Sequence, residues 1–284
     1  MEILIINDFS TDSNYTLKII EKLKKEDPRI TIVNNKKNMG ILYSRSIGVL
    51  KAKGEYIMNL DHDDLIFDQD VFDISYKAAK KENFDIISLM YVISNNYYSK
   101  IKEIKPHDLK IPNKKIVLQP ELSIYTLFKG DEFRYYDYTI WAKLFKAIIY
   151  KKAIQTLTYQ RYSVFNTYNE DLIGTFIICN LANSYKYIRK FGVFHRRNFS
   201  SASYIAKKEN RIFDDIFFSE VILDFAKIPF KKYGAIFLEK RAKYSNNKNN
   251  KYLNKVLNKV LDCKYIDKKY KVKLQKKFPG LLKI

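Results

Sequence analysis

Apolar residues in the first part of the chain form short continuous runs that alternate with helical repeats. The run Glu2–Ile6 is almost wholly apolar, which is typical of a strand buried on both faces in a parallel sheet. A helix with one apolar face is predicted from about Ser13, and Asp27–Pro28 ends it. A second short strand is predicted over Ile30–Val33. The chain therefore opens with a strand–helix–strand unit.

The same alternation continues through the next segment. Asn38–Gly40 opens a helix that closes near Gly54, and a mostly apolar strand, Tyr56–Leu60, follows it. A helix is predicted over Asp70–Lys81 and a strand over Phe84–Val92. Alternation of this kind predicts an α/β fold in which a mixed sheet is flanked by helices on both faces.

The pattern is less regular in the middle of the chain. Residues 95–120 lose periodicity and contain three prolines, so they are predicted to be mostly loops. The further elements predicted are helices over Leu122–Phe128, over Tyr138–Phe145 with Ile148 and Ile149, and over an apolar, buried body Leu172–Leu181 that begins at Asn169, and a strand over Tyr185–Phe194.

The last part of the chain is predicted to be helical and is strongly basic. An apolar stripe at helical spacing, Leu253 to Leu261, lies among lysines. The chain has a formal net charge of +21, and residues 240–284 hold fifteen Lys or Arg against two Asp. We therefore divide the chain into an α/β domain, 1–204, and a helical, Lys-rich C-terminal region, 205–284. Residues 240–284 are either a solvated face or a contact for anionic lipid head groups; they carry no recognised motif for nucleic acid, so no such partner is expected.

The sequence also bounds the compartment. No apolar run reaches the ~18–20 residues of a membrane span, and no secretory signal opens the chain. Cys179 and Cys263 form neither a disulfide framework nor a metal knuckle. We therefore expect a cytoplasmic protein, and peripheral membrane contact through residues 240–284 stays one of the two alternatives given above.

Three carboxylates in four residues, Asp61, Asp63 and Asp64, directly follow the strand Tyr56–Leu60. Carboxylates this close repel one another, so a fold that keeps them together usually shares a cation among them. Mg²⁺ and Mn²⁺ take oxygen ligands and are often held by one or two carboxylates plus substrate phosphates. In open α/β sheets, ligands bind beyond the carboxyl ends of the strands, where this cluster lies. The alternative is an acidic turn in which Asp64 or Asp68 caps the next helix.

Four other residues carry candidate chemistry, each with a structural alternative. Asp8, at the end of the first strand, could accept hydrogen bonds from a base or ribose, or cap a helix. Arg45, one turn into its helix, could clamp a diphosphate, or face solvent. Glu170 and Asp171, at a helix start, could supply a general base, or complement the helix dipole.

Taken in order, these segments resemble glycosyltransferase family 2, whose members have the GT-A fold. Residues 5–12 look like the family's apolar strand followed by Asp-Asp-Gly-Ser-x-Asp. Residues 38–48 and 54–64 look like its Asn-x-Gly, Ala-Arg-Asn-x-Gly, Gly-Glu-Tyr-Ile and Asp-x-Asp-Asp block. Further along, Trp141–Phe145 is similar to Trp-x-Lys-Leu-Tyr, Glu170–Asp171 matches a Glu-Asp pair, and Phe194–Ser203 resembles Tyr-x-Tyr-Arg-x-x-x-x-Ser-x-Ser. The resemblance covers about residues 2–204.

The resemblance implies a Rossmann-like GT-A mixed sheet and the transfer of a sugar, with inversion, from a nucleotide-sugar to an acceptor hydroxyl. The donor would usually be a UDP-sugar, and the acceptor a glycan, a lipid-linked molecule or a protein. Asp63 would hold Mn²⁺ or Mg²⁺ against the diphosphate, with Asp61 contacting the ribose or the metal shell. Asp171 would take the acceptor proton as general base, with Glu170 as the alternative base.

The resemblance implies further contacts to the nucleotide. Asp8 would contact the nucleotide, and Arg45 would add a positive contact on the same side. His195 or Arg196 would close over the diphosphate from the C-terminal side. The alternative for His195 is an ordinary histidine at a strand end.

The sequence departs from the family pattern in two ways. The family usually begins with a further strand, of the type Val-Ile-Ile-Pro-x-Tyr-Asn, which lies in the sheet beside the strand that here starts at Glu2, and its end forms part of the nucleotide pocket. Here Asn7–Phe9 also replaces Asp-Asp-Gly, which removes one carboxylate and a permissive turn residue. Two hypotheses follow: a working enzyme, or a catalytically silent relative that acts as a binding or partner protein.

Overall fold

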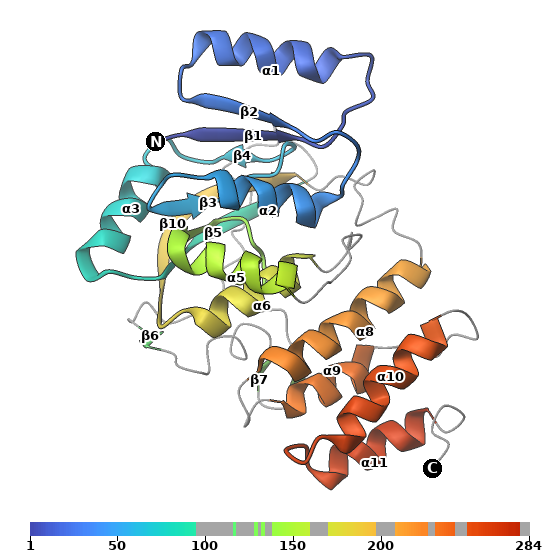
Figure 1. Ribbon diagram of the computed structural model, residues 1–284. Coiled ribbons are helices and arrows are strands. Elements are labelled where there is room, and N and C mark those ends of the chain that lie inside the picture. Colours follow the sequence, from blue (N-terminus) through green and yellow to red (C-terminus); the bar gives the residue numbers. More distant parts are fainter. Residues whose placement is uncertain are drawn as a thin grey trace.

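Strands and helices alternate along much of the first two thirds of the chain, and the elements described after β10 are all helices (Figure 1). This computed structural model describes residues 1–94, 116–117, 128–129, 132–133, 138–159, 170–196, 208–226, 231–241 and 249–278. The strands are β1 (Ile3–Asn7), β2 (Ile30–Asn34), β3 (Tyr56–Met58), β4 (Leu65–Ile66), β5 (Ile86–Ser94), β6 (Ile116–Val117), β7 (Phe128–Lys129), β8 (Glu132–Phe133), β9 (Lys143–Lys146) and β10 (Ser184–Arg196). The helices are α1 (Tyr15–Glu26), α2 (Ile41–Lys51), α3 (Val71–Glu82), α5 (Ala147–Tyr159), α6 (Glu170–Leu181), α8 (Lys208–Phe225), α9 (Lys232–Arg241), α10 (Asn249–Asp262) and α11 (Lys268–Lys277). The predicted α/β class is confirmed.

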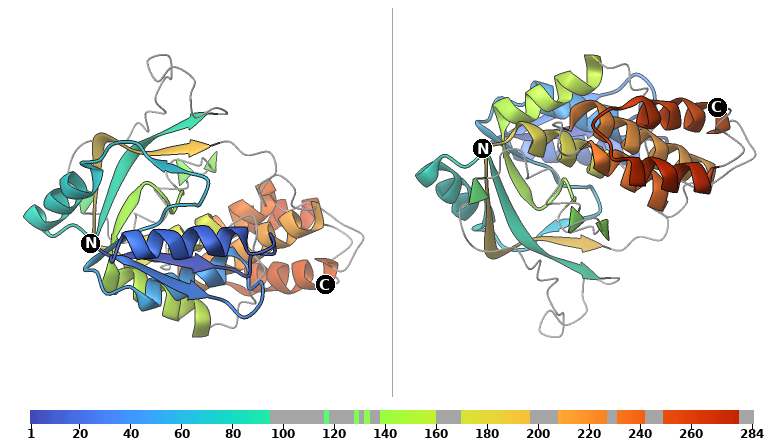
Figure 2. Two further views of the ribbon diagram at one scale, coloured as in Figure 1. Left: turned by 90° about the horizontal axis from the view of Figure 1, so that it is seen from above. Right: turned by 90° about the horizontal axis from the view of Figure 1, so that it is seen from below.

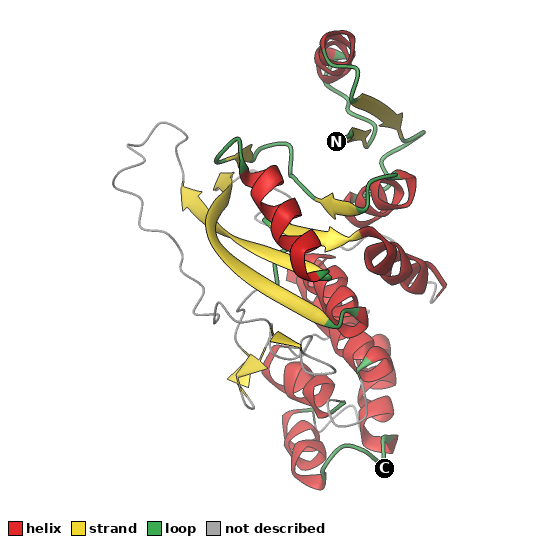
Figure 3. Ribbon diagram, turned by 90° about the vertical axis from the view of Figure 1, so that its left-hand side faces the viewer, coloured by secondary structure: helices red, strands yellow, loops and turns green. Residues whose placement is uncertain are grey.

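The larger sheet is mixed and has the strand order β3-β9-β5-β10-β4, with β6 also paired to β10. Its longest pair is formed by the parallel strands β5 and β10, which run from Ile86 beside Tyr185 to Ser94 beside Arg196. These two long strands curve together across the sheet in Figure 3. Because β10 also pairs antiparallel with β4, its last residues lie beside the turn that joins β3 to β4.

Strands β1 and β2 form a separate parallel pair and do not join the larger sheet. Helix α1 packs on β2, and helix α2 packs on β1. Figure 1 shows α1, β2 and β1 as a layer at the opposite end of the molecule from α10 and α11. The prediction that Glu2–Ile6 is fully buried is wrong, because Ile3–Ile6 are only partly buried. Among the described strands β1 pairs with β2 alone, so its other edge lies where the resemblance expects one further strand.

The helical prediction for Tyr138–Phe145 is wrong, because Lys143–Lys146 is a strand in the interior of the larger sheet. This strand, β9, pairs antiparallel with β3 on one side and with β5 on the other. Helix α5 begins only at Ala147. Lys143, Leu144 and Phe145 are all buried, so the segment lacks the alternation that marks a half-exposed strand. The predicted helix over 122–127 and most of the predicted loop over 95–120 lie outside the described residues, and Phe128 belongs to a strand.

The C-terminal helices share one apolar core with the α/β part. The cluster of buried side chains extends from Phe176 on α6 through Phe218 on α8 to Phe237 on α9, and on to Leu257 and Leu274. Figure 2 shows these helices grouped on one side of the molecule, next to the sheet. In the predicted apolar stripe of α10, Leu253, Val256, Leu257 and Val260 are buried and Leu261 is partly buried. None of the helices that the structure describes has the length and apolar character that crossing a membrane requires.

Candidate active site

The acidic segment Asp61–Asp64 forms the turn between β3 and β4. A backbone hydrogen bond of 3.0 Å from the Asp64 N–H to the Asp61 carbonyl closes this turn. Asp61 and Asp63 are partly exposed, whereas the side chain of Asp64 is completely buried. The turn therefore buries one carboxylate completely and leaves the other two partly exposed.

Asp64 ties the acidic turn to the end of β10. Its carboxylate lies 2.9 and 3.0 Å from Nδ1 of His195 and accepts a 3.1 Å hydrogen bond from the Arg196 backbone N–H. Asp64 is therefore not the helix cap that the sequence offered as an alternative; the capping position of α3 is Asp70. Burial alone would lower the pKa of His195, but the hydrogen bond and the charge of Asp64 raise it above its usual range.

Trp141 holds the ring of His195 from the other side. The two rings are stacked, with centroids 4.6 Å apart and planes 13° from parallel. Trp141 follows the segment Tyr138–Ile140 and precedes Ala142, whose positive φ of 54° is rare for a residue with a side chain. Sequence reasoning quoted the Trp-x-Lys motif but did not name Trp141 as a site residue. The signal in the sequence was the only tryptophan of the chain, two positions before Lys143.

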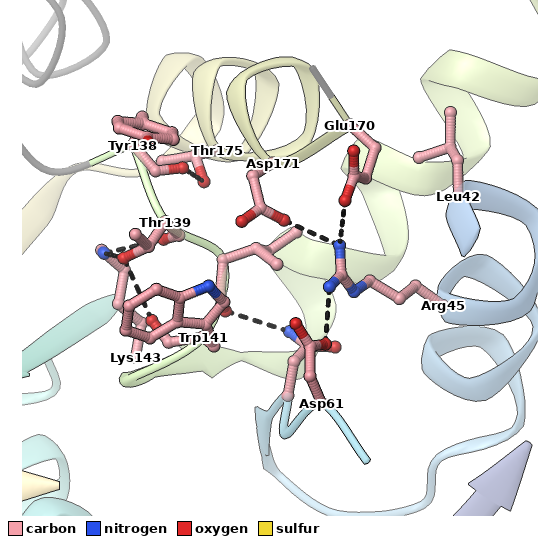
Figure 4. A network of polar contacts seen from close by, with 12 residues as sticks. Leu42, Arg45, Asp61, Tyr138, Thr139, Trp141, Lys143, Glu170, Asp171 and Thr175 are labelled. Carbon is pink, nitrogen blue, oxygen red and sulfur yellow. Dashed lines mark hydrogen bonds and ion pairs between the residues drawn. The ribbon is translucent and has the colours of Figure 1, made fainter. Parts of the chain in front are cut away.

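Arg45 lies at the centre of the site and contacts three carboxylates. Its Nη1 donates to Asp171 at 2.7 Å and to Glu170 at 3.2 Å, and its Nη2 donates to Asp61 at 2.7 Å (Figure 4). The Arg45 side chain is only 10% exposed. Although burial opposes it, the charges of Asp171, Asp61 and Glu170 raise the pKa of Arg45 well above its usual value. The solvent-facing alternative for Arg45 is therefore wrong.

Glu170 and Asp171 begin helix α6 and are both largely buried, with side-chain exposures of 9% and 16%. Burial, together with the charge of Asp171, raises the pKa of Glu170 to about 7, although Arg45 opposes this shift. Burial also raises the pKa of Asp171 against the effect of Arg45. A carboxylate whose pKa approaches neutral pH can both accept and release a proton, which is the property that general acid–base chemistry requires.

Asp8 uses both of its carboxylate oxygens within the protein. Oδ1 accepts hydrogen bonds from the Met39 N–H at 2.8 Å and from the side chain of Asn35 at 2.7 Å, and Oδ2 accepts one from the Gly40 N–H at 2.8 Å. Asn35 also donates to the hydroxyl of Ser44, the residue before Arg45. Asp8 thereby fixes the loop that leads into α2. Asp8 does not cap α1, whose capping position is Asn14, so its observed contacts match neither of the two alternatives that the sequence offered.

The predicted site residues thus come together in part. Arg45 joins Asp61, Glu170 and Asp171, while Asp64 joins His195 and Arg196 to the same acidic turn, which also carries Asp63. Residues 197–203, the remainder of the resemblance after β10, lie outside the described residues. The carboxylates that follow β3 and those at the start of α6 therefore lie in one cluster around Arg45, although more than a hundred residues separate them in the sequence.

The sequence of residues 1–148 matches the family model described as "Glycosyl transferase family 2". An uncharacterized glycosyltransferase of Haemophilus influenzae is 27% identical over 134 residues, which cover 47% of this chain and 48% of that protein. The poly(ribitol-phosphate) β-N-acetylglucosaminyltransferase TarP of Staphylococcus aureus is 34% identical over 104 residues, 36% of this chain and 31% of that protein. This chain therefore spans less than half the length of either relative.

The fold is also shared with a solved glycosyltransferase structure. The crystal structure of Staphylococcus aureus TarS residues 1–349 in complex with UDP-GlcNAc superimposes with a TM-score of 0.64 and 15% identity. The match covers 95% of this chain and 73% of that chain, so it extends into the C-terminal helices. At this identity the likeness establishes the GT-A fold. Because the family model matches 148 of the 284 residues, the chain belongs to glycosyltransferase family 2.

Proposed function

We propose that this chain is an inverting glycosyltransferase that transfers a sugar from a UDP-sugar to an acceptor hydroxyl. The observation that carries this proposal is the pair Glu170–Asp171, whose buried carboxylates have raised pKa values and are joined through Arg45 to the acidic turn at Asp61. The TarS neighbour is in complex with UDP-GlcNAc, which supports a donor of the same chemical class.

In the proposed reaction Asp171 acts as the general base. The acceptor oxygen attacks the anomeric carbon while Asp171 takes the hydroxyl proton, and the bond from that carbon to the diphosphate oxygen breaks. A single displacement of this kind inverts the anomeric centre, because the acceptor approaches opposite the leaving group. One base on the acceptor side is then sufficient. Glu170 lies beside Asp171 and is the alternative proton acceptor.

We propose that Asp63 and Asp61 hold Mn²⁺ or Mg²⁺. Among the described residues no three His, Cys, Asp or Glu side chains form a ready metal site. Two carboxylates on one turn still fit, because Mg²⁺ is often bound by one or two carboxylates with substrate phosphates and water as the other ligands. Arg45 bonds to Oδ1 of Asp61, so Oδ2 is the atom we assign to the metal. The bound metal would offset the charge on the departing diphosphate.

The remaining predicted residues take supporting roles in this proposal. His195, stacked on Trp141 and held by Asp64, would face the diphosphate together with Arg196. Because Asp8 already accepts hydrogen bonds from Met39, Gly40 and Asn35, we assign it to holding the loop before α2. It then acts on the nucleotide through the shape of that loop, and a direct bond to the ribose is not needed.

The test is turnover of a panel of UDP-sugars with Mn²⁺, measured as release of UDP. We expect Asp171→Asn to lower kcat by about 100-fold or more, which is the usual contribution of a general base. Asp63→Ala should abolish the response to Mn²⁺. Asp73→Asn removes an exposed carboxylate on α3 and should leave turnover unchanged. Full activity in Asp171→Asn would contradict the assignment of the base.

A catalytically silent relative that acts as a binding or partner protein is the second candidate function. It is favoured by Asn7, which stands where the family pattern has a carboxylate and whose side chain bonds to Asn34 and Ser10 within the protein. Turnover of the donor panel, measured together with UDP binding by calorimetry, separates the two candidates. UDP binding without turnover of any donor would favour the silent relative, whereas turnover would exclude it.

We also propose an acceptor hydroxyl on a glycan, a lipid-linked molecule or a protein, and peripheral contact with an anionic membrane through residues 240–284. The relative TarP is named for transfer to poly(ribitol-phosphate), an acceptor that carries repeated phosphates. In the present chain α11 has six lysines within Lys268–Lys277 and no acidic residue. A helix of this charge suits a surface rich in phosphate.

A further inference from the structure

We propose that Arg45 is a positioning residue, which holds Asp171 in place for proton transfer and ties it to the acidic turn at Asp61. This inference rests on the proposed glycosyltransferase function and adds a role for Arg45 that differs from a contact with the donor diphosphate. The guanidinium bridges two parts of the site that are distant in sequence. Figure 4 shows it reaching from α2 between Asp61 on one side and the start of α6 on the other.

The geometry of the guanidinium supports a positioning role. Its two terminal nitrogens make separate 2.7 Å bonds to Asp171 and to Asp61, and Nη1 makes a third bond of 3.2 Å to Glu170. Charge-assisted bonds of this length are among the strong ones, and the planar fork fixes the direction of each. Glu170 and Asp171 take both hydrogens of Nη1, so a diphosphate that leaves the carboxylates in place could reach only Nε and the second hydrogen of Nη2.

The charge balance leads to the same assignment. One guanidinium faces three carboxylates, so this cluster has an excess of negative charge even when Glu170 carries a proton. A diphosphate placed beside the cluster would be repelled by that excess, whereas a cation would be attracted. Arg45 therefore neutralises part of the charge of the carboxylates, whereas a bound cation would neutralise the charge of the diphosphate.

The residues next to Arg45 and Asp61 make hydrogen bonds of their own. On the same helix Ser44 accepts the bond from Asn35, which also bonds to Asp8. Beside Asp61, the amide of Asn59 donates to the hydroxyl of the fully buried Tyr150 at 3.2 Å. A long, flexible side chain gains little order from a bond at the surface, but the Arg45 side chain is only 10% exposed. The position of Asp171 is set by a braced arginine.

The experiment compares Arg45→Met and Arg45→Lys with wild type, measuring UDP affinity by calorimetry and kcat by UDP release. Arg29→Met is the matched control, since Arg29 is a half-exposed arginine that bonds to Asp27 in a surface turn. We expect Arg45→Met to lower kcat by about 100-fold, as expected for a misplaced base, with less than a threefold change in the Kd for UDP. Arg45→Lys retains the charge and should recover part of kcat. The control should match wild type in both measurements.

A double variant tests whether Arg45 acts through Asp171. If it does, Arg45→Met combined with Asp171→Asn should be no slower than Asp171→Asn alone, because the two residues then act as a unit. Multiplied losses in the double variant, or UDP binding weakened tenfold or more in both Arg45 variants, would overturn the positioning role. If Arg45→Met fails to fold by circular dichroism, Arg45→Gln, which also removes the charge, replaces it in both comparisons. Absence of turnover in wild type would instead refute the proposed function itself, and the inference with it.

Discussion

At the scale of single residues, the candidate site side chains could be predicted from the sequence, but the contacts between them could not. The acidic turn and Glu170–Asp171 could be found because carboxylates cluster beside predicted strand and helix ends. The sequence offered no way to separate Asp64 from Asp61 and Asp63. Asp64 is distinguished by His195 and Arg196, which lie 131 and 132 positions further along the chain. Likewise, Arg45 meets Glu170 across 125 positions, a contact that local pattern does not encode.

Glu170 gives a prediction about stability and pH. The folded chain keeps the Glu170 proton up to about pH 7, whereas the unfolded chain releases it near its ordinary pKa of 4.5. This group therefore stabilises the fold at low pH, and that contribution is lost as the pH rises through this window, by up to about 3 kcal/mol. Glu170→Gln carries no proton to lose. Its melting temperature should fall less than that of wild type between pH 5 and pH 8.

Thermal unfolding of both proteins at several pH values checks this expectation. Glu170 and Asp171 share one cluster, so the measured slope belongs to the pair. Asp73→Asn, an exposed carboxylate paired with Lys77 on α3, should leave the slope of wild type unchanged. Equal slopes for wild type and Glu170→Gln would show that Glu170 is ionised in the folded chain at low pH.

At the scale of elements, the strands that alternate with helices along the chain were predicted well, whereas β9 was not. The predicted runs match four strands closely, β1, β2, β5 and β10, because turns or helices clearly mark the ends of each. The residues of β9 are buried on both faces and run directly into α5. A short buried strand cannot be told from a helix by periodicity alone. Its identity depends on β3 and β5, which come more than fifty residues earlier.

The pairing of β5 with β10 leads to a second prediction, at Gly192. The register of this pair shifts between Phe191 and Val193, and Gly192 lies at that irregularity. A Cβ placed there would lie 2.7 Å from Cδ1 and 2.9 Å from Cβ of the buried Leu89. Gly192→Ala should therefore destabilise the fold by about 1–3 kcal/mol, the usual cost of overpacking.

Urea denaturation measures this effect. Gly48→Ala is the matched control, because Gly48 lies within α2 and its Cβ would contact only the side chain of Ile6, at 3.2 Å. Alanine also favours a helix more than glycine does, by about 1 kcal/mol, so this control should lose less stability than Gly192→Ala, or none. A neutral Gly192→Ala would mean that β10 can move away from Leu89 at low cost.

At the scale of the whole molecule, the sequence predicted a basic helical region but not its integration with the rest. The lysines and the apolar stripe of α10 were both visible in the sequence. The surface that this stripe covers could not be predicted, because it depends on how α8, α9 and α11 pack. The buried cluster runs without interruption from α6 to Leu274. Deleting residues 240–284 would expose buried side chains such as Leu238 and Phe237, so a truncated chain is a poor test of membrane binding.

Charge reversal on the surface of α11 is the sharper test. Lys269, Lys273 and Lys276 are exposed and spaced by four and three residues, so they share one face of the helix. Changing all three to Glu should leave the core intact. If α11 contacts the membrane, sedimentation with vesicles that contain phosphatidylserine should weaken by about 100-fold or more, since each lysine near such a surface contributes about 1 kcal/mol.

The chain contains a control with the same spacing. Lys18, Lys22 and Lys25 are exposed on α1, at the opposite end of the molecule, and changing them to Glu alters the net charge equally. If α11 makes the contact, this variant should bind vesicles nearly as strongly as wild type does, with only a small loss of binding. Equal weakening of the two triple variants would indicate that net charge alone attracts the chain to the vesicles. Binding that persists in the α11 variant at 0.15 M salt would place the contact elsewhere, because screening at that ionic strength removes attraction beyond about 8 Å.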